Sequence, residues 1–391
     1  MPTVPSRAVG PRLPGLDLIR AAAIGWVLIY HGSLFGLTSQ DYWLVANGWM
    51  GVDLFFVLSG FLIAGQLLRP WALGSAPSYA RFFARRLLRT LPAYLAVLAL
   101  YVLIPGIRER PSMAPVWQFL SFSQNWLYEY PIHGLKAFSH AWSLCVEEQF
   151  YLLFSAAVAL IALRPSPAKV VAALVLVLLL GMALRAFLWL QFVGDPPFDM
   201  AADPRAGRYQ HFIYCPTWTR LDGLLMGIVA AAIQTFRPAA WARLTARPNL
   251  LLGAGVLGVV VSTFIFRHGS IAPFWPAVVG YPVLSFAIML IVIAGSDSRS
   301  LIGRHRVPGA AALAAGAYSL YLSHKIVFHW VELLRPQLPA SVQWAAFGLA
   351  VLGALGFGAA LYWLVERPFL KLRDRFEGRS RSPLALGPAA G

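Results

Sequence analysis

Two ionisable side chains lie on one face of an apolar segment near the start of the chain. Arg20 and His31 are eleven positions apart, which places them on the same side of an α-helix, about 16 Å apart along its axis. Ionisable groups are costly inside a membrane, so both residues are candidates for function. An imidazole can act as a general base and a guanidinium can bind phosphate. The alternative is a polar contact between packed helices.

Two adjacent carboxylates, Glu147 and Glu148, occupy a second apolar segment. Neighbouring residues on a helix point in different directions, so we expect one carboxylate to face the interior and the other to pair sideways. An inward Glu147 at the depth of His31 would orient the imidazole and stabilise its charge. The alternative is that both glutamates pair with buried arginines such as Arg220 or Arg185.

Further polar residues interrupt other apolar segments. Asp53 lies just inside the expected outer interface, where a structural role is at least as well supported as a catalytic one. The spacing of Arg220 and Asp222 predicts an internal ion pair. Lys325 requires an acid or a water-filled cavity, and Glu332, two helical turns further on, is one candidate partner.

A basic stretch at residues 76–90 precedes the third apolar segment and contains Arg86 and Arg89. It fits either an interfacial helix on anionic lipid or a phosphate-binding cluster. The loop at residues 107–141 is rich in Trp and Tyr, which is typical of a membrane-interface belt and also suits a platform for a sugar ring.

The elements that must position these residues are long apolar helices. The chain has 391 residues, of which 59% are hydrophobic and only 12% charged. Soluble domains carry about 25% charged residues, so this composition excludes a soluble enzyme, a disordered chain and a disulfide scaffold. Long unbroken apolar runs disfavour a β-barrel. The sequence predicts an all-α integral membrane protein.

Common catalytic and metal-binding motifs are absent from the sequence. The two cysteines, Cys145 and Cys215, form no metal-binding or redox pattern. The sequence also lacks the nucleophile elbow, the phosphate-binding loop and the zinc-protease motif, so serine hydrolysis, phosphoryl transfer and zinc chemistry are unsupported. We expect no bound metal.

About ten transmembrane helices are expected from the length of the apolar runs. With the N-terminus inside, Lys and Arg favour the cytoplasmic loops by about three to one, which places both termini in the cytoplasm. The excess of Lys and Arg in the cytoplasmic loops accounts for the formal charge of +16, so nucleic-acid binding is not needed to explain it. The expected spans are residues 15–37, 49–68, 90–106, 142–163, 168–190, 216–235, 249–266, 275–294, 309–332 and 343–365.

The expected organisation is one membrane domain with short ends. Residues 1–14 form a cytoplasmic tail, residues 15–365 the transmembrane domain, and residues 366–391 a basic tail that we expect to be disordered. No cleavable signal peptide is expected, because the first apolar segment contains Arg20 and lacks a small-residue cleavage site.

Six segments, taken together and in order, resemble the membrane-bound acyltransferase-3 family. The resemblance implies transfer of an acyl group, by default acetyl, from cytoplasmic acyl-CoA to a hydroxyl, usually on a sugar. It also implies a multi-pass protein of the bacterial cytoplasmic (inner) membrane. The segments are Arg20-x10-His31, GVDLFFVLSGFLI at 51–63, ARRLLRTLPAY at 84–94, HAWSLCVEEQFYLL at 140–153, RLDGLLMG at 220–227 and AYSLYLSH at 317–324.

The resemblance also assigns roles to residues. His31 and Arg20 match the family's essential first-helix pair, Arg86 and Arg89 its Arg-x-x-Arg motif, and Glu147 its functional acid. Acyl-CoA is then a co-substrate rather than a bound cofactor, and the other partners are a glycan or glycolipid acceptor and membrane lipid. Apart from these assignments, the candidates for supporting roles are Asp53, Trp142, Ser143, Glu148, Arg220, Asp222 and His324.

Two departures from the family pattern concern Cys145, where Ser or Ala is common, and Lys325, which follows His324 where an apolar or aromatic residue is usual. The SGNH hydrolase-like domain that some members append is missing from the sequence, so we expect a stand-alone enzyme.

In the expected mechanism, Arg86 and Arg89 bind the CoA phosphates at the cytoplasmic end, with Arg20 deeper in the bilayer. The thioester reaches His31, which acts as general base on an acceptor hydroxyl entering from outside, while Glu147 holds the tautomer of the imidazole. The sequence fits both direct attack by the acceptor and transfer through a transient acyl-histidine. The indole of Trp142 and the hydroxyl of Ser143 are candidate oxyanion donors.

A proton-coupled transporter is the main rival class, because buried His, Glu and Lys side chains can relay protons. Inverted repeats with broken helices would favour it, and the sequence shows none. A passive membrane scaffold would leave Arg20 and His31 without a purpose. A macrolide-type secondary metabolite is the alternative acceptor, and the sequence does not specify the oligomeric state.

Overall fold

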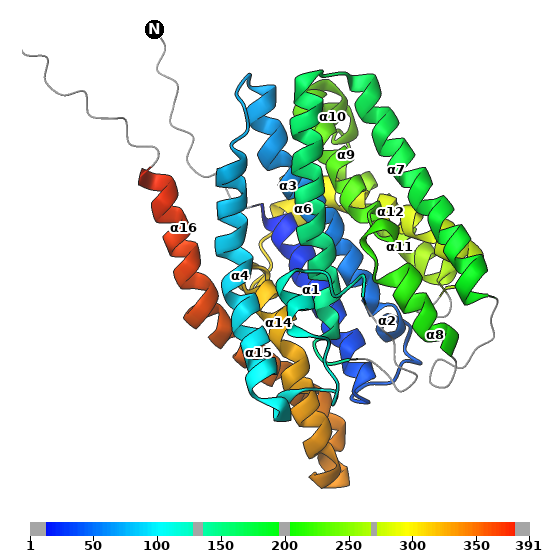
Figure 1. Cartoon of the computed structure of the whole chain (residues 1–391), viewed down its shortest axis with the longest axis vertical. Coiled ribbons are helices and arrows are strands. Elements are labelled where there is room, and N and C mark those ends of the chain that lie inside the picture. Colours follow the sequence, from blue (N-terminus) through cyan, green and yellow to red (C-terminus); the bar gives the residue numbers. More distant parts are fainter. Residues whose placement is uncertain (1–12, 128–135, 195–203, 267–271, 380–391) are drawn as a thin grey trace, which may run out of the picture. The chain divides into compact units, whose positions relative to one another are not determined.

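The computed structural model describes residues 13–127, 136–194, 204–266 and 272–379. Within these ranges the regular structure is helical and no β-strand is present; one isolated bridge joins Met113 and Ala137. The all-α prediction is therefore confirmed for this part of the chain. Figure 1 labels the helices along the chain. They belong to two compact units, one within residues 1–77 and 110–317 and the other within residues 78–109 and 318–391.

Helices α3 and α9 make the most extensive helix–helix contact of the first unit. A Cβ atom at Gly60 would collide with the backbone of Leu224, and one at Gly227 with the backbone of Val57, so both positions require glycine. The helices of this unit are α1 (Pro14–Leu34), α2 (Trp43–Ala46), α3 (Gly51–Ala72), α5 (Val116–Leu120), α6 (Trp142–Leu163), α7 (Pro167–Leu188), α8 (Pro204–Tyr209), α9 (Asp222–Phe236), α10 (Pro238–Leu244), α11 (Pro248–Ile265), α12 (Tyr281–Gly295) and α13 (Leu301–Arg304).

The second unit contains α4 (Tyr79–Leu103), α15 (Ala346–Leu361), α16 (Arg367–Arg379) and the part of α14 (Ala310–Leu334) that begins at Tyr318. The hydroxyl of Ser78 caps α4 by accepting the backbone N–H of Arg81. Most of the basic stretch at 76–90 forms the first turns of α4, so it is continuous with the apolar part of that helix.

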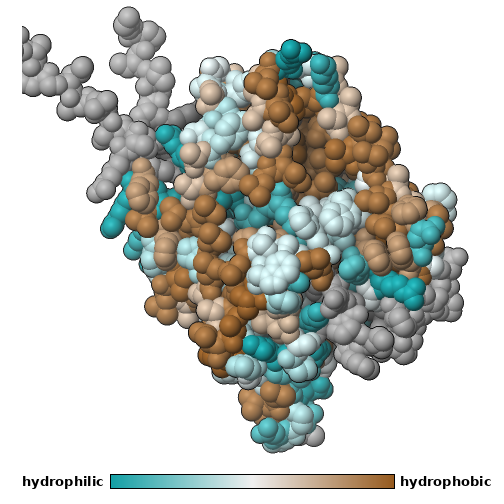
Figure 2. Space-filling model, in the orientation of Figure 1, coloured by the Kyte–Doolittle hydropathy of each residue, from teal (hydrophilic) through white to brown (hydrophobic). Residues whose placement is uncertain are grey.

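Seven helical stretches within the described residues are long and apolar enough to span a membrane. The bent pair α9 and α10, with 116° between its two helices, would make an eighth. Apolar side chains cover much of the visible surface of α6 and α7 (Figure 2), as lipid contact requires. The seven are Gly48–Ala72, Tyr79–Leu103, Ser139–Leu163, Pro167–Val193, Pro248–Ile265, Pro276–Gly295 and Ser341–Phe376.

The difference from the expected ten lies mainly in two polar helices. Helix α1 has 21 residues and α14 has 25, at the positions predicted for spans, but neither is among the seven. Their ionisable side chains, among them Arg20 and His31 in α1 and Lys325 in α14, lower the mean hydropathy. The count of ten and the cytoplasmic termini stay predictions.

The disorder expected at residues 366–391 is wrong for residues 367–379, which form α16. The helix continues from α15 through a π-turn at Tyr362–Glu366. The Glu366 carboxylate is buried and accepts a hydrogen bond from Ser319 at 2.6 Å, and the Arg367 guanidinium lies 3.8 Å from the ring centre of Trp363. These contacts anchor the start of α16. Residues 380–391, and residues 1–12 of the expected N-terminal tail, lie outside the described residues.

Candidate active site

His31 lies in the last turn of α1, with 9% of its surface exposed. Its ring centre is 6.3 Å from that of His140, and the two ring planes meet at 68°. Tyr30 is the other ring beside it, at 5.8 Å. The imidazole therefore faces the interior of the first unit. Arg20, on the same helix, is half-buried.

His140 is a residue that the sequence analysis did not single out as a site residue. It lies in a 3-10 turn at Ser139–Ala141, directly before α6, and only 2% of its surface is exposed. The signal available in the sequence was that His140 begins the segment at 140–153 that resembles the family. The apolar pattern gave no indication of His140, because the expected span begins only at residue 142.

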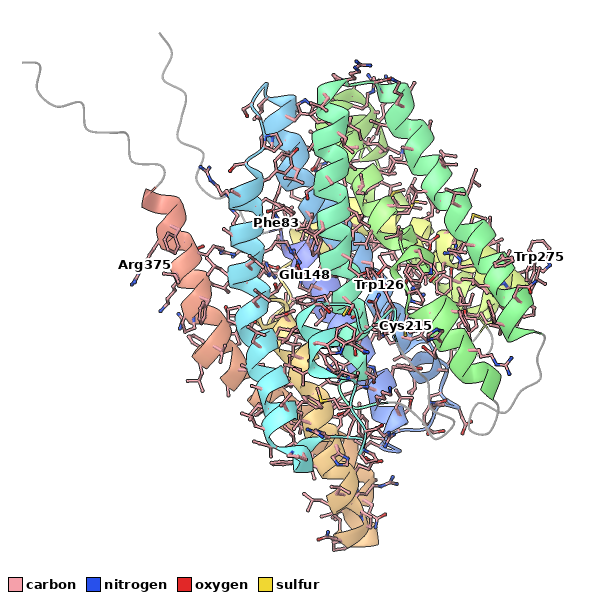
Figure 3. The ribbon with its side chains drawn as sticks, in the orientation of Figure 1. Phe83, Trp126, Glu148, Cys215, Trp275 and Arg375 are labelled. Carbon is pink, nitrogen blue, oxygen red and sulfur yellow. The ribbon has the colours of Figure 1, made fainter. Side chains whose placement is uncertain are left out.

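Glu147 accepts hydrogen bonds at both carboxylate oxygens. The Ser59 hydroxyl donates to Oε1 at 2.9 Å, and the Tyr151 hydroxyl donates to Oε2 at 2.7 Å. Ser59 comes from α3, so the carboxylate links α3 to α6. Glu147 lies seven positions after His140, about 10 Å further along the helix. Its neighbour Glu148 is half-buried on α6 (Figure 3).

The ion pair expected between Arg220 and Asp222 is wrong. Arg220 instead donates to Asp53 at 2.9 Å, with 1% and 3% of the two side chains exposed. Tyr281 and Tyr214 surround the guanidinium, with ring centres 4.2 Å and 4.8 Å from its central carbon. A buried guanidinium is stable only when it is paired, and the carboxylate and the rings provide this environment.

Asp222 pairs with Arg185 in a bidentate contact, with N–O distances of 2.7 Å and 3.0 Å. Arg185 also donates to the carbonyls of Thr219 at 2.7 Å and Val278 at 3.0 Å. The alternative that these arginines neutralise Glu147 and Glu148 is therefore wrong. The two arginine–aspartate pairs connect α3, α7 and α9 and act as a polar lock within the first unit.

Trp142 and Ser143 lie beside the residues just described. The Trp142 ring centre is 5.7 Å from the central carbon of the Arg220 guanidinium and 4.9 Å from the ring centre of Tyr214. The Ser143 hydroxyl donates to the carbonyl of His140 at 3.4 Å. Trp142 thus belongs to the aromatic surroundings of Arg220, and Ser143 to the turn that carries His140.

The remaining predicted site residues belong to the second unit. Arg86 and Arg89 are half-buried on α4. His324 is fully buried on α14, and its Nδ1 lies 2.9 Å from the carbonyl oxygen of Tyr321 and 3.1 Å from that of Leu320. Because both acceptors are carbonyls, Nδ1 carries the proton, which binds the imidazole to its own helix.

The expected pairing of Lys325 with Glu332 is wrong. Lys325 lies 4.0 Å from Glu109, and both side chains are buried. Glu332 instead lies 3.1 Å from His329, one turn away on the same helix. The part of the chain that the structure describes contains no group of three or more His, Cys, Asp or Glu residues that could hold a metal ion.

Comparison with known proteins adds to this geometry. The family model described as "Acyltransferase domain", of the acyltransferase-3 type, matches residues 13–363. The chain belongs to the acyltransferase-3 family. The match covers both structural units, and with them every candidate site residue named above.

Two relatives of the chain come from Staphylococcus aureus. "O-acetyltransferase OatA" of strain NCTC 8325 / PS 47 is 28% identical over 350 residues, covering 84% of this chain and 53% of the relative. "Putative O-acetyltransferase SACOL0978" of strain COL is 25% identical over 382 residues, covering 92% of this chain and 57% of the relative. The chain thus spans about half the length of these curated relatives. No solved structure matches it.

Proposed function

We propose that this protein is a membrane-bound O-acyltransferase that moves an acetyl group from cytoplasmic acetyl-CoA to a hydroxyl of a cell-surface or exported glycan, such as an O-antigen or an exopolysaccharide. Family membership and the O-acetyltransferase names of the relatives support the reaction class. The observation that supports His31 as the catalytic residue is that its side chain is buried on a helix of a membrane protein and lies next to a second imidazole.

His31 serves as the general base. As the acceptor oxygen attacks the thioester carbonyl carbon, its proton passes to His31 and a carbon–oxygen bond forms. The carbon–sulfur bond then breaks, and the CoA thiolate takes up the proton from the imidazolium. A positioned base contributes about 10²–10⁴-fold to such a step. Glu147, held by two hydroxyl donors, supplies negative charge on the neighbouring helix α6.

The donor is held by arginines. Arg86 and Arg89 on α4 bind the phosphates of CoA, because guanidinium groups bind phosphate oxygens in pairs. Arg20 on α1 is a third candidate for binding the donor. The protein resides in the bacterial inner membrane, where the donor approaches from the cytoplasm and the glycan acceptor from outside.

Mass spectrometry of surface glycans tests this function. Strains with the gene, without it, and with a His31→Ala variant at equal membrane abundance are compared for a mass increment of one acetyl group. The increment should be present only with the wild-type gene. An unchanged increment with His31→Ala contradicts the role of His31, and an unchanged glycan in the deletion strain contradicts the acceptor class.

A further inference from the structure

His140 is a buried imidazole that the proposed reaction does not use. It comes from a different element than His31, and the two rings meet edge to face with centres 6.3 Å apart. This separation and angle lie within the range that aromatic pairs prefer. His140 therefore contacts the candidate base as a packing partner of defined geometry.

The segment that carries His140 is held by several independent contacts. Phe138, directly before the 3-10 turn, has φ of 58°, a left-handed conformation that is uncommon for an aromatic residue. Its fully buried ring packs against Phe119 at 5.5 Å and edge-on against His140 at 5.2 Å. Such backbone conformations persist only where the surroundings fix them, and they cluster at functional sites.

Two backbone contacts secure the other side of this segment. The N–H of Ala137 donates to the carbonyl of Ser112 at 2.8 Å, next to the isolated bridge between Ala137 and Met113. The N–H of Ala141 donates to the carbonyl of Phe138 at 3.2 Å. The backbone hydrogen bonds of this turn and the buried Phe138 ring thus hold the His140 ring beside the His31 ring.

We propose that His140 is a positioning residue that fixes the ring plane of His31, so that the base nitrogen meets the acceptor hydroxyl in a productive direction. The proposal rests on the proposed acyl transfer. A general base depends on the direction of its lone pair, and small misplacements of a catalytic group cost large factors in rate. On this view His140 acts through its flat ring rather than through its nitrogens.

Two substitutions separate ring packing from other roles. His140→Phe keeps a flat ring at the position, whereas His140→Leu fills a similar space without one. We expect His140→Phe to retain kcat within about 3-fold and His140→Leu to lose about 10- to 100-fold. The KM values for acetyl-CoA and for the acceptor should stay unchanged in both, because on this proposal the ring acts only on the orientation of His31. His211→Ala is the matched control, since His211 also packs edge-on against a ring, Phe212, at 4.5 Å.

A second readout does not depend on turnover. Diethyl pyrocarbonate modifies neutral imidazoles. Mass spectrometry measures how fast it modifies His31 in the full-length protein in nanodiscs. We expect faster modification of His31 in His140→Leu, whereas His140→Phe and His211→Ala should match the wild type. If His140→Leu does not fold, Phe138→Asn replaces it, because Asn tolerates the left-handed backbone while removing the ring that holds His140.

The outcomes separate the two proposals. Wild-type protein that transfers no acetyl group to any glycan acceptor contradicts the proposed function. Wild-type protein that transfers it, together with a folded His140→Leu variant of wild-type kcat and wild-type His31 reactivity, overturns only the positioning role. A His140→Phe variant as impaired as His140→Leu also overturns it, because a nitrogen of His140 would then be required.

Discussion

Arg220 reaches across to Asp53 on α3, at 2.9 Å, although Asp222 lies only two positions away in the sequence. Asp222 in turn accepts both ends of the Arg185 guanidinium from α7. Each buried charge is therefore neutralised by a partner on another element. The consequence is a lock that depends on three helices packing in one arrangement.

The first prediction concerns this lock. Asp53→Asn should destabilise the protein by about 3–5 kcal/mol, because it leaves the Arg220 guanidinium buried without a counter-charge. Thermal unfolding in detergent measures the loss. The double variant Asp53→Leu, Arg220→Met should recover much of it, since apolar residues can replace a buried pair. Asp297→Asn is the control, because its partner Arg299 is largely exposed; an equal loss there would contradict the explanation.

The sequence predicted the helices more reliably than the partners of the buried charges. The apolar runs predicted spans that the structure forms as helices, including α1 and α14 with their polar residues. The pairing of Arg220 with Asp222 was wrong because Arg220 lies in the turn before α9, where its side chain reaches Asp53 on α3, while Asp222 on α9 is taken by Arg185 from α7. Lys325 pairs with Glu109, which is distant in sequence, and such a choice depends on how helices pack.

Composition and motifs therefore identify the family and the candidate base, but tertiary contacts decide the neighbours of that base. His140 illustrates this limit. It lies outside the apolar run of α6, and only the three-dimensional structure places its ring beside that of His31. Ser59 is similar, because only the packing of α3 against α6 brings its hydroxyl to the Glu147 carboxylate.

The second prediction separates charge from packing at Glu147. Glu147→Gln keeps an acceptor oxygen for one of the two hydroxyls and offers an N–H to the oxygen of the other, but removes the negative charge. We expect unfolding stability within about 1 kcal/mol of the wild type and a loss of transfer of about 100-fold. Steady-state kinetics and thermal unfolding of the same preparation measure both. A fully active Glu147→Gln variant would show that linking α3 to α6 is the whole role of this carboxylate.

The third prediction concerns the second unit. Glu109→Gln should destabilise it by about 3–5 kcal/mol, because Lys325 is then buried without its acid. Glu332→Gln, which alters only the partly exposed contact with His329, should change stability little. Limited proteolysis at the α4 and α14 segments reports on this unit. Equal protection of the two variants would argue against a stabilising Lys325–Glu109 pair.

The fourth prediction tests the donor site. Replacing Arg86 and Arg89 by Ala should raise the KM for acetyl-CoA by about 10- to 100-fold, because each removes a charge-assisted hydrogen bond to phosphate. The KM for the acceptor should stay constant. Arg81→Ala is the matched control, since Arg81 is exposed on the first turn of the same helix. Binding of CoA measured by calorimetry checks the result without turnover. Equal loss of donor and acceptor affinity, or an equal effect of Arg81→Ala, would instead indicate that this basic stretch of α4 serves contact with anionic lipid.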